Sequence, residues 1–293
     1  MLNIDEIKDK RIAVLLSGGV DSSVVVWEFA QLGLHPDCFY IKIGPEEKEE
    51  WDCSSEEDLE MATAVARKYG CKLQVVDCHH EYWNEVTRYT MEKVKAGFTP
   101  NPDVMCNQTV KFGTFAERAF AAGADFVATG HYARVAPAAE KGTGDKPAAE
   151  RPVRLLRAAD EHKDQTYFLW RVGADVLART LFPVGNVPSK AEVRHMCAER
   201  GLGVEAKPDS DGICFVGPVG IRTFLLDTLD RRAGDIVEWE SGRVLGHHDG
   251  AFLFTVGQRK GLDLGGGPAR EASASAVPSP KGVKSNEDRV AYL

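Results

Sequence analysis

Residues 12–23 have the sequence IAVLLSGGVDSS, in which five apolar residues lead into a glycine turn and then into a helical pattern. The apolar run 12–16 is typical of a buried strand of a parallel sheet, and the spacing that follows predicts a helix over residues 22–32. The start of such a helix offers backbone N–H groups to an anion, and glycine lets the backbone approach a phosphate closely. The stretch therefore predicts a strand, a phosphate-binding turn and a helix.

The turn differs from a Walker loop, which carries a lysine directly after its last glycine. Residues 17–23 contain no lysine. They suit the binding of a pyrophosphate group better than the arrangement found in kinases and GTPases. A plain glycine turn followed by a Ser or Asp helix cap is the alternative interpretation.

Outward from this stretch, short apolar runs alternate with longer helical patterns over the first 130 residues. The expected strands are 12–16, 38–43, 73–76 and 126–129, and the expected helices are 22–32, one beginning at Ser54 or Ser55, 81–95 and 110–122. Such alternation is typical of βαβ units around a parallel sheet. The predicted fold class is therefore α/β with a parallel sheet, accompanied by a second, smaller β-rich domain.

Three segments are expected along the chain. Residues 1–205 are predicted to form the α/β domain, and residues 206–266 a small central β-rich domain, because strand-like runs such as 235–239 and 252–256 lie between glycine turns. Residues 267–293 are rich in Gly, Ala, Ser and Pro and are predicted to be a disordered tail. The segment 136–152 is expected to be a surface excursion that adds no core.

The composition is that of a soluble globular chain, with 293 residues, 43% hydrophobic and 27% charged. No apolar run approaches the ~18 residues of a membrane helix, and the charged first ten residues show no signal-peptide pattern. The net charge is -8, and residues 46–60 alone hold nine acids and one lysine. The remaining 35 basic and 35 acidic residues balance, so charge neither supports nor excludes RNA binding.

Seven cysteines without a C-x-x-C pair argue against a disulfide framework or a zinc ribbon, and they favour a reducing cytoplasm. Cysteine is often a small buried apolar residue. We expect this role for Cys38, Cys53, Cys71, Cys78 and Cys197. No cluster with recognisable metal-ligand spacing occurs in the sequence.

Three polar segments are candidates for chemistry. A stiff loop with two prolines leads into Cys106, and the carboxyl group of Asp103 within it could serve as a general acid or base, or could cap an Asn-Pro-Asp turn. The Lys-Asp-Gln sequence at 163–165 could contact phosphate or be a solvated helix start. His131, after the strand expected at 126–129, could orient phosphate or be a structural hydrogen-bonding residue.

With the turn at 17–23, these segments resemble the tRNA-specific 2-thiouridylase family, whose adenine-nucleotide α hydrolase-like domain belongs to the PP-loop ATP pyrophosphatases. The matching motifs, in order, are SGGVDSS (17–23), TPNPDVMCN (99–107), VKF (110–112), ATGHY (128–132), KDQTYFL (163–169), FPVG (182–185), GICFVG (212–217) and TVGQRKGL (255–262). The resemblance covers roughly residues 10–266.

The resemblance implies that ATP activates the C2 oxygen of the wobble uridine of tRNA as an adenylate, and that sulfur from a cysteine persulfide replaces this oxygen. Cys214 matches the cysteine that carries the persulfide. Cys106 matches its partner, which attacks the persulfide, releases the sulfur and leaves a disulfide with Cys214. Asp103 matches the proposed general acid/base.

The resemblance also implies ligand contacts and partners. The implied ATP contacts are Leu15, Leu16, Ser17, Gly18, Gly19, Val20, Asp21, Ser22, Ile41 and Gly130. The implied tRNA contacts are Asn101, Pro102, Asp103, Lys163, Asp164 and Gln165. Mg²⁺ is implied only as the companion of ATP, without a dedicated protein site. The implied partners are tRNA and a sulfur donor, either a cysteine desulfurase or a sulfur-relay protein, with no membrane.

Family members usually continue into a third, C-terminal β-barrel domain, whereas this chain enters its low-complexity segment after Gly267. A weaker affinity for tRNA is therefore expected, since phosphate contacts dominate nucleic-acid binding. Two alternatives remain open. One is another PP-loop adenylating ligase, which would not need both Cys106 and Cys214, and the other is a nucleotide- or tRNA-binding remnant that leaves tRNA unmodified.

Overall fold

The computed structural model describes residues 4–43, 55–138, 153–208, 220–258, 261–262 and 264. The chain divides into two compact units, Met1–Arg88 with Asn101–Pro218, and Tyr89–Pro100 with Val219–Leu293. The domain bounds predicted from the sequence are 1–205 and 206–266. In the structure, Tyr89–Pro100 belongs to the second unit, which these bounds did not anticipate. The predicted tail, 267–293, lies outside the described residues.

The first unit is built on a parallel sheet with the strand order β3-β2-β1-β4-β7. Its strands are β1 (Ile12–Leu15), β2 (Asp37–Lys42), β3 (Leu73–Asp77), β4 (Phe126–Ala128) and β7 (Thr180–Leu181). The parallel sheet confirms the predicted α/β class, and the first four strands lie where the apolar runs predict them. Strand β7 was not predicted, because two residues are too short to show a pattern.

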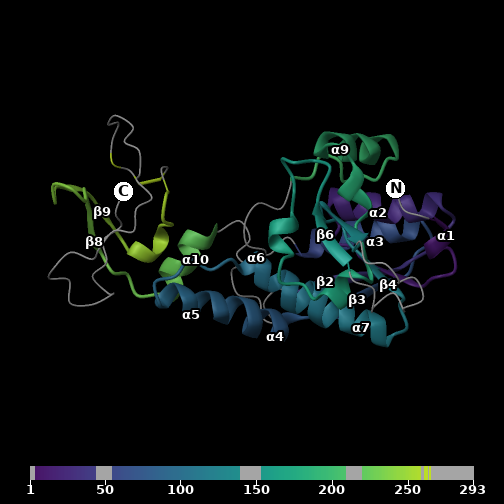
Figure 1. The fold of residues 1–293 in the computed structure, drawn as a ribbon, viewed down its shortest axis with the longest axis horizontal. Helices are drawn as coiled ribbons and strands as arrows, with labels where there is room; N and C mark the ends of the chain where they lie inside the picture. The colour runs from purple at the N-terminus through teal and green to yellow at the C-terminus, as the bar shows by residue number, and fades with distance from the viewer. Residues whose placement is uncertain are drawn as a thin grey trace. The chain divides into compact units, whose positions relative to one another are not determined.

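Helices cover both faces of this sheet (Figure 1). Helices α2 (Val20–Gln31), α3 (Ser55–Lys68) and α9 (Lys190–Glu199) pack on one face, and α7 (Ala116–Ala121) packs on the other. Since successive strand residues point to opposite faces, Val14 of β1 joins the cluster with α2, and its neighbour Ala13 joins the cluster with α7. This alternation makes β1 the buried centre of the unit.

The other elements of this unit are short. They are α1 (Ile4–Ile7), α4 (His79–Tyr82), η1 (Trp83–Arg88), α6 (Pro102–Met105), the π-helix η2 (Cys106–Phe115), β5 (Ala133–Pro137), β6 (Val153–Arg157), η4 (Thr166–Phe168), α8 (Ala174–Leu177) and η5 (Pro183–Asn186). Strands β5 and β6 pair antiparallel. This hairpin was not predicted, because the Ala- and Pro-rich composition of residues 136–152 masks the strands at its ends.

The second unit contains α5 (Tyr89–Lys95), α10 (Gly220–Thr228), β8 (Gly234–Val237), β9 (Val244–His248) and η7 (Ala251–Leu253). Val94 of α5 packs with Leu225 and Leu229 of α10, and β8 pairs antiparallel with β9. Strand β8 confirms the strand expected at 235–239. The strand expected at 252–256 is wrong, because residues 251–253 form a 3₁₀ turn after Gly250. Within the described ranges, every helix is too short or too polar to span a bilayer.

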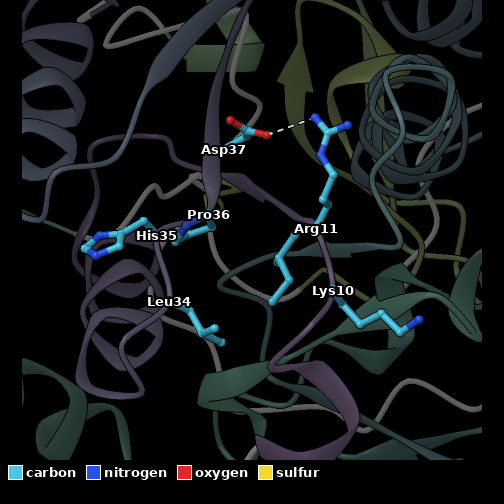
Figure 2. A pocket seen from close by; sticks show the side chains of 7 residues that line it. Lys10, Arg11, Leu34, His35, Pro36 and Asp37 are labelled. Carbon is cyan, nitrogen blue, oxygen red and sulfur yellow. Dashed lines mark hydrogen bonds and ion pairs between the residues drawn. The ribbon is translucent and has the colours of Figure 1, made fainter.

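A hollow of about 240 Å³ lies at the amino ends of β1 and β2 (Figure 2). It is lined by Lys10, Arg11, Ile12, Leu34, His35, Pro36 and Asp37. Arg11 turns toward Asp37, with 3.4 Å between Nη2 and Oδ2. Ligands of open α/β sheets bind at the opposite edge, beyond the carboxyl ends of the strands. None of the residues predicted to contact ATP or tRNA lines this hollow.

Gly185 provides a test of how closely η5 approaches strand β5 of the hairpin. A Cβ there would overlap the carbonyl oxygen of Ala133 in β5. Gly185→Ala should lower the free energy of unfolding by about 3 kcal/mol, since backbone has to move. Gly33→Ala is the comparison, because Gly33 has φ +73° but no neighbouring atom within 4 Å and should cost only about 1 kcal/mol. Equal losses in urea denaturation would contradict this account.

Candidate functional site

The direction in which strands are added to the parallel sheet reverses between β1 and β4. From β1 the chain moves outward to β2 and β3, whereas β4 and then β7 extend the sheet on the other side. Such a switch point is where open α/β sheets bind ligands. Gly130, just after β4, lies so close to α2 that a Cβ would be 2.9 Å from Asp21 Cβ and from Ser22 N. The fold thus brings three of the predicted ATP contacts together.

The glycine turn leaves the start of α2 open. Gly18 has φ +76°, and a side chain there would overlap the carbonyl oxygen of Asp58. Gly19 is the N-cap of α2 and makes no side-chain cap hydrogen bond, while the Ser23 hydroxyl donates to Gly19 O at 2.8 Å. The alternative of a Ser or Asp helix cap is therefore wrong. Ser17 is held by Ser22, whose hydroxyl oxygen accepts from Ser17 N at 3.2 Å.

The predicted apolar contacts lie beneath this turn. Leu16 is wholly buried, and its N–H donates to Phe39 O at 2.8 Å, so only its backbone could face a ligand. Leu15 and Ile41 are partly buried and pack against the same cluster of β-sheet and α7 residues. Val20, the first residue of α2, is also buried. These four residues support the shape of the turn.

Asp21 joins three distant parts of the chain. Its Oδ1 accepts a hydrogen bond of 2.7 Å from Tyr132 Oη, and Lys190 Nζ lies 2.6 Å from Oδ1 and 2.7 Å from Oδ2. Tyr132 is 1% exposed, and the Lys190 side chain is 12% exposed. Sequence reasoning missed Lys190, because a lysine in an amphipathic helix gives no local signal, and it assigned no role to Tyr132.

Residues 97–101 are non-helical, as the predicted loop requires, whereas Pro102–Met105, directly before Cys106, form the short helix α6. Asn101 caps α6 by accepting from Val104 N at 3.1 Å, and Pro102 occupies the first turn. Asparagine as N-cap followed by proline is a strong helix start. Cys106 is 4% exposed and begins η2. The cap is Asn101, so the alternative in which Asp103 caps a turn is wrong.

Lys111, on η2, influences two titratable groups near Cys106. Burial raises the pKa of Asp103, and the positive charge of Lys111 opposes this rise. Desolvation and the same lysine both hold the pKa of His131 well below its usual value, so the ring is neutral at neutral pH. The His131 ring packs against Phe112 at 5.7 Å, and Nδ1 lies 2.8 Å from Thr129 Oγ1. This packing supports the structural role for His131.

Two buried acceptors follow Cys106 in the chain. Asn107 donates through Nδ2 to Asp103 O at 3.0 Å, which leaves its Oδ1 buried without a hydrogen-bond partner in the described part of the structure. Gln108 Oε1 is in the same situation. A buried polar atom without a partner is costly. Both oxygens are therefore suited to accept from a bound substrate.

The segment 163–165 is organised by its own side chains. Asp164 accepts from Arg157 Nε at 2.9 Å and from Thr166 Oγ1 at 2.7 Å. Desolvation raises the pKa of Asp164. These and neighbouring hydrogen bonds outweigh desolvation and bring the pKa below its usual value. Gln165 accepts from Tyr132 N at 2.9 Å. Both residues thus shape the loop, and Gln165 ties it to the residue that binds Asp21.

Exposed aromatic residues follow this loop, and sequence reasoning gave them no role. Tyr167 is 65% and Trp170 is 66% exposed. The guanidinium of Arg171 lies 5.6 Å from the Trp170 ring, and its Nη1 is 3.5 Å from the sulfur of Met105, the residue before Cys106. A cation stacked on an exposed ring, and in contact with the residue before a buried cysteine, is suited to flat, anionic ligands.

The cysteines are only partly accounted for. Cys214 and Cys53 lie outside the described residues, so the pairing of Cys106 with Cys214 stays a prediction. Cys38, Cys78 and Cys197 are buried, as expected.

Cys71 departs from the expectation of burial, since it is half-buried. A hydrogen bond from the Cys38 thiol lowers the pKa of Cys71 to about 7, and the charge of nearby His35 acts in the same direction.

Comparisons with known proteins define the class to which this chain belongs. Residues 10–218 match the family model described as the tRNA methyl transferase HUP domain, and residues 222–274 match the tRNA methyl transferase PRC-barrel domain. The tRNA-specific 2-thiouridylase MnmA 1 of Bacteroides thetaiotaomicron is 47% identical over 257 residues, which are 88% of this chain and 69% of the relative. The MnmA of Bacillus velezensis is 41% identical over 259 residues, 88% of this chain and 66% of the relative.

The chain belongs to the tRNA-specific 2-thiouridylase family, a family of tRNA-uridine sulfurtransferases. The family models are described by methyl transfer and the relatives by thiolation. The family assignment rests on the relatives, because their identity extends over 88% of the chain. Among solved structures, the U34-tRNA thiolase NcsA of Methanococcus maripaludis aligns with a TM-score of 0.45 and 15% identity, covering 76% of this chain and 67% of that chain. Likeness at this level supports no functional inference.

The thiol pair formed by Cys38 of β2 and Cys71, just before β3, yields a pH-dependent prediction. Because its pKa is about 7, Cys71 is largely thiolate at pH 8, whereas burial raises the pKa of Cys78 to about 11. Iodoacetamide should modify Cys71 at least about tenfold faster than Cys78, with half-maximal rate near pH 7. Cys38→Ala removes the hydrogen bond and should shift this midpoint upward. Peptide mass spectrometry measures both rates, and equal labelling of the two cysteines would contradict the assignment.

Proposed function

We propose that this chain catalyses the ATP-dependent 2-thiolation of the wobble uridine of tRNA, giving 2-thiouridine, AMP and pyrophosphate. The observation that carries the proposal is the setting of Cys106, a buried cysteine three residues from Asp103, whose pKa is raised by burial. The helix that begins at Cys106 reaches the predicted nucleotide site, because its Phe112 contacts His131, the neighbour of Gly130. Membership of the thiouridylase family supports the same reaction.

ATP is proposed to bind at residues 15–22, Ile41 and Gly130, with Mg²⁺ as the companion of its phosphates. The N-terminus of α2, whose N-cap Gly19 makes no side-chain cap hydrogen bond, and the left-handed Gly18 fit a phosphate group. Bound there, ATP would supply the activation that turns the C2 oxygen of the uridine into a leaving group. The residues of the chain hold the phosphates and orient the nucleotide.

Sulfur transfer is assigned to Cys106 and Cys214. The Cys106 thiolate attacks the inner sulfur of a persulfide on Cys214, and a Cys106–Cys214 disulfide forms as the bond to the outer sulfur breaks. The outer sulfur leaves with the electron pair as hydrosulfide and takes the place of the activated oxygen. The disulfide is then reduced by an external thiol, and a cysteine desulfurase or sulfur-relay protein renews the persulfide.

Asp103 is proposed to exchange the proton of this step. Burial raises the pKa of its carboxyl toward the range in which a group both accepts and donates a proton. The carbonyl oxygen of Asp103 also fixes Asn107, whose unpaired Oδ1 is an acceptor for the target base. Asn101 and Pro102, which start the same helix, place this carboxyl relative to Cys106.

The tRNA is proposed to lie along Lys163, Tyr167, Trp170 and Arg171. Single-stranded bases stack on exposed rings, and cations contact the phosphates. Asp164 and Gln165 take part by holding the loop in place, since their side chains already bind protein groups. The contact of Arg171 with Met105 links this surface to the residue beside Cys106.

Nucleoside mass spectrometry tests the reaction. Unmodified tRNA is incubated with the protein, ATP, Mg²⁺ and a sulfur source, and we expect 2-thiouridine. Cys106→Ser and Cys214→Ser should each reduce product about a thousandfold or more, since both sulfurs take part in one step. Cys71→Ser is the matched control and should retain activity. Product that persists in Cys106→Ser would exclude the two-cysteine step, and ATP binding without product from the unaltered protein would favour the binding remnant.

Trp170→Ala tests the RNA surface. Stacking is worth about 1–3 kcal/mol per base, so the dissociation constant for tRNA should rise about 5- to 100-fold, while that for ATP stays unchanged. Trp83→Ala serves as the control, because Trp83 is 53% exposed on η1 and has no assigned contact with tRNA. Electrophoretic mobility shifts at fixed salt measure the affinity. Equal effects of the two substitutions would remove the assignment.

A further inference from the structure

The ammonium group of Lys190 occupies an unusual position. It lies 2.6 and 2.7 Å from the two carboxylate oxygens of Asp21, and Asp21 is in the first turn of α2. The positive end of the helix dipole disfavours a cation there and favours an anion. The Lys190 side chain is 12% and the Asp21 side chain 30% exposed, and the desolvation of such a partly buried pair offsets much of its attraction. Stability alone therefore does not explain why an ammonium is held at this point.

The backbone of Lys190 is held in place at the start of α9. Lys190 is the first residue of α9, which is capped by Ser189 through a 3.2 Å bond from Glu192 N. The N–H of Lys190 donates to Asp160 Oδ2 at 2.8 Å. Asp160 is itself 6% exposed. Its other carboxylate oxygen accepts from His162 N at 3.0 Å and from Lys163 N at 3.3 Å, so one buried carboxylate fixes the start of α9 relative to the loop at 162–163.

The side chain of Lys190 is guided from this anchor to the glycine turn. Its Nζ lies 5.7 Å from the centroid of the Tyr132 ring, and the Tyr132 hydroxyl donates to the same Asp21 oxygen that Lys190 contacts. Gly130 brings the backbone after β4 against Asp21. The ammonium is therefore held at the first turn of α2, next to the backbone that follows β4.

We propose that Lys190 binds the phosphate groups of ATP that leave as pyrophosphate, and that Asp21 and Tyr132 hold its ammonium in position. This inference rests on the proposed use of ATP. A Walker loop carries its own phosphate-binding lysine, whereas residues 17–23 contain none. The proposal assigns this role to Lys190 of α9. Lys190 is then a binding residue for the triphosphate, and Tyr132 is a positioning residue that acts through Asp21.

The test compares ligands that differ only in phosphate. Dissociation constants for ATP, AMP and inorganic pyrophosphate are measured by calorimetry for the unaltered protein and for Lys190→Met. Loss of a charged hydrogen bond to phosphate should weaken ATP and pyrophosphate about 10- to 100-fold, whereas AMP should change less than about threefold. Lys190→Arg keeps the charge and should recover part of the loss.

Two controls separate binding from folding. Lys68→Met removes a lysine of α3 that binds the carbonyls of Arg200 and Gly201, and it should leave ATP affinity unchanged. The double variant Asp21→Asn, Lys190→Met removes both charges, so no unpaired carboxylate remains, and it should still bind ATP and pyrophosphate weakly.

The outcomes are distinct. If Lys190→Met binds ATP as tightly as the unaltered protein, or loses AMP and ATP equally, the role of Lys190 is refuted while the proposed function stands. If the unaltered protein binds AMP but neither ATP nor pyrophosphate, the ATP-dependent function and this inference fail together.

Discussion

The Asp21 carboxylate is the point on which the functional half of the first unit depends. It binds Tyr132, 111 residues further along the chain, and Lys190, 169 residues further along. Tyr132 in turn holds the loop at 163–165, because its N–H donates to Gln165 and its carbonyl accepts from Gln165 N at 2.8 Å. One charged group in the first turn of α2 therefore links the glycine turn, the loop after β4, the start of α9 and the segment that leads to Trp170.

The parts of the fold that could be predicted are those with a local cause. The apolar residues of β1, the glycine turn and α2 follow one another in sequence, so their periodicity and chemistry are visible without any other part of the chain. Strand β7 has only two residues and exists because Val127 N donates to Arg179 O and Thr129 N to Leu181 O, at 2.9 and 3.2 Å. Such a strand is created by its neighbour and leaves no pattern of its own.

The residues of the candidate site also divide into those with a local sequence signal and those whose role depends on tertiary packing. The motif residues from Ser17 to Ser22, together with Gly130, could be proposed as phosphate contacts from the sequence, because phosphate binding needs glycine and a helix start in a fixed order. Lys190 could not, because its role depends on the packing of α9 against α2. The helix at Pro102–Met105 was missed although its cap, Asn101, and its first-turn proline are adjacent in the sequence. There the two prolines were weighed as loop formers, whereas one of them starts a helix.

Lys111 shows how a single charge can give two neighbouring groups different protonation behaviour. For Asp103, burial favours the neutral acid and the lysine favours the carboxylate, so the two effects oppose each other. For His131, burial and the lysine both disfavour the protonated ring, so the effects add. Burial raises the pKa of the carboxyl group above its usual value, while the imidazole is kept neutral among Phe112 and Phe182. The proton exchange proposed for Asp103 thus depends on a balance of two opposed effects, whereas His131 has no such balance and packs as a neutral ring.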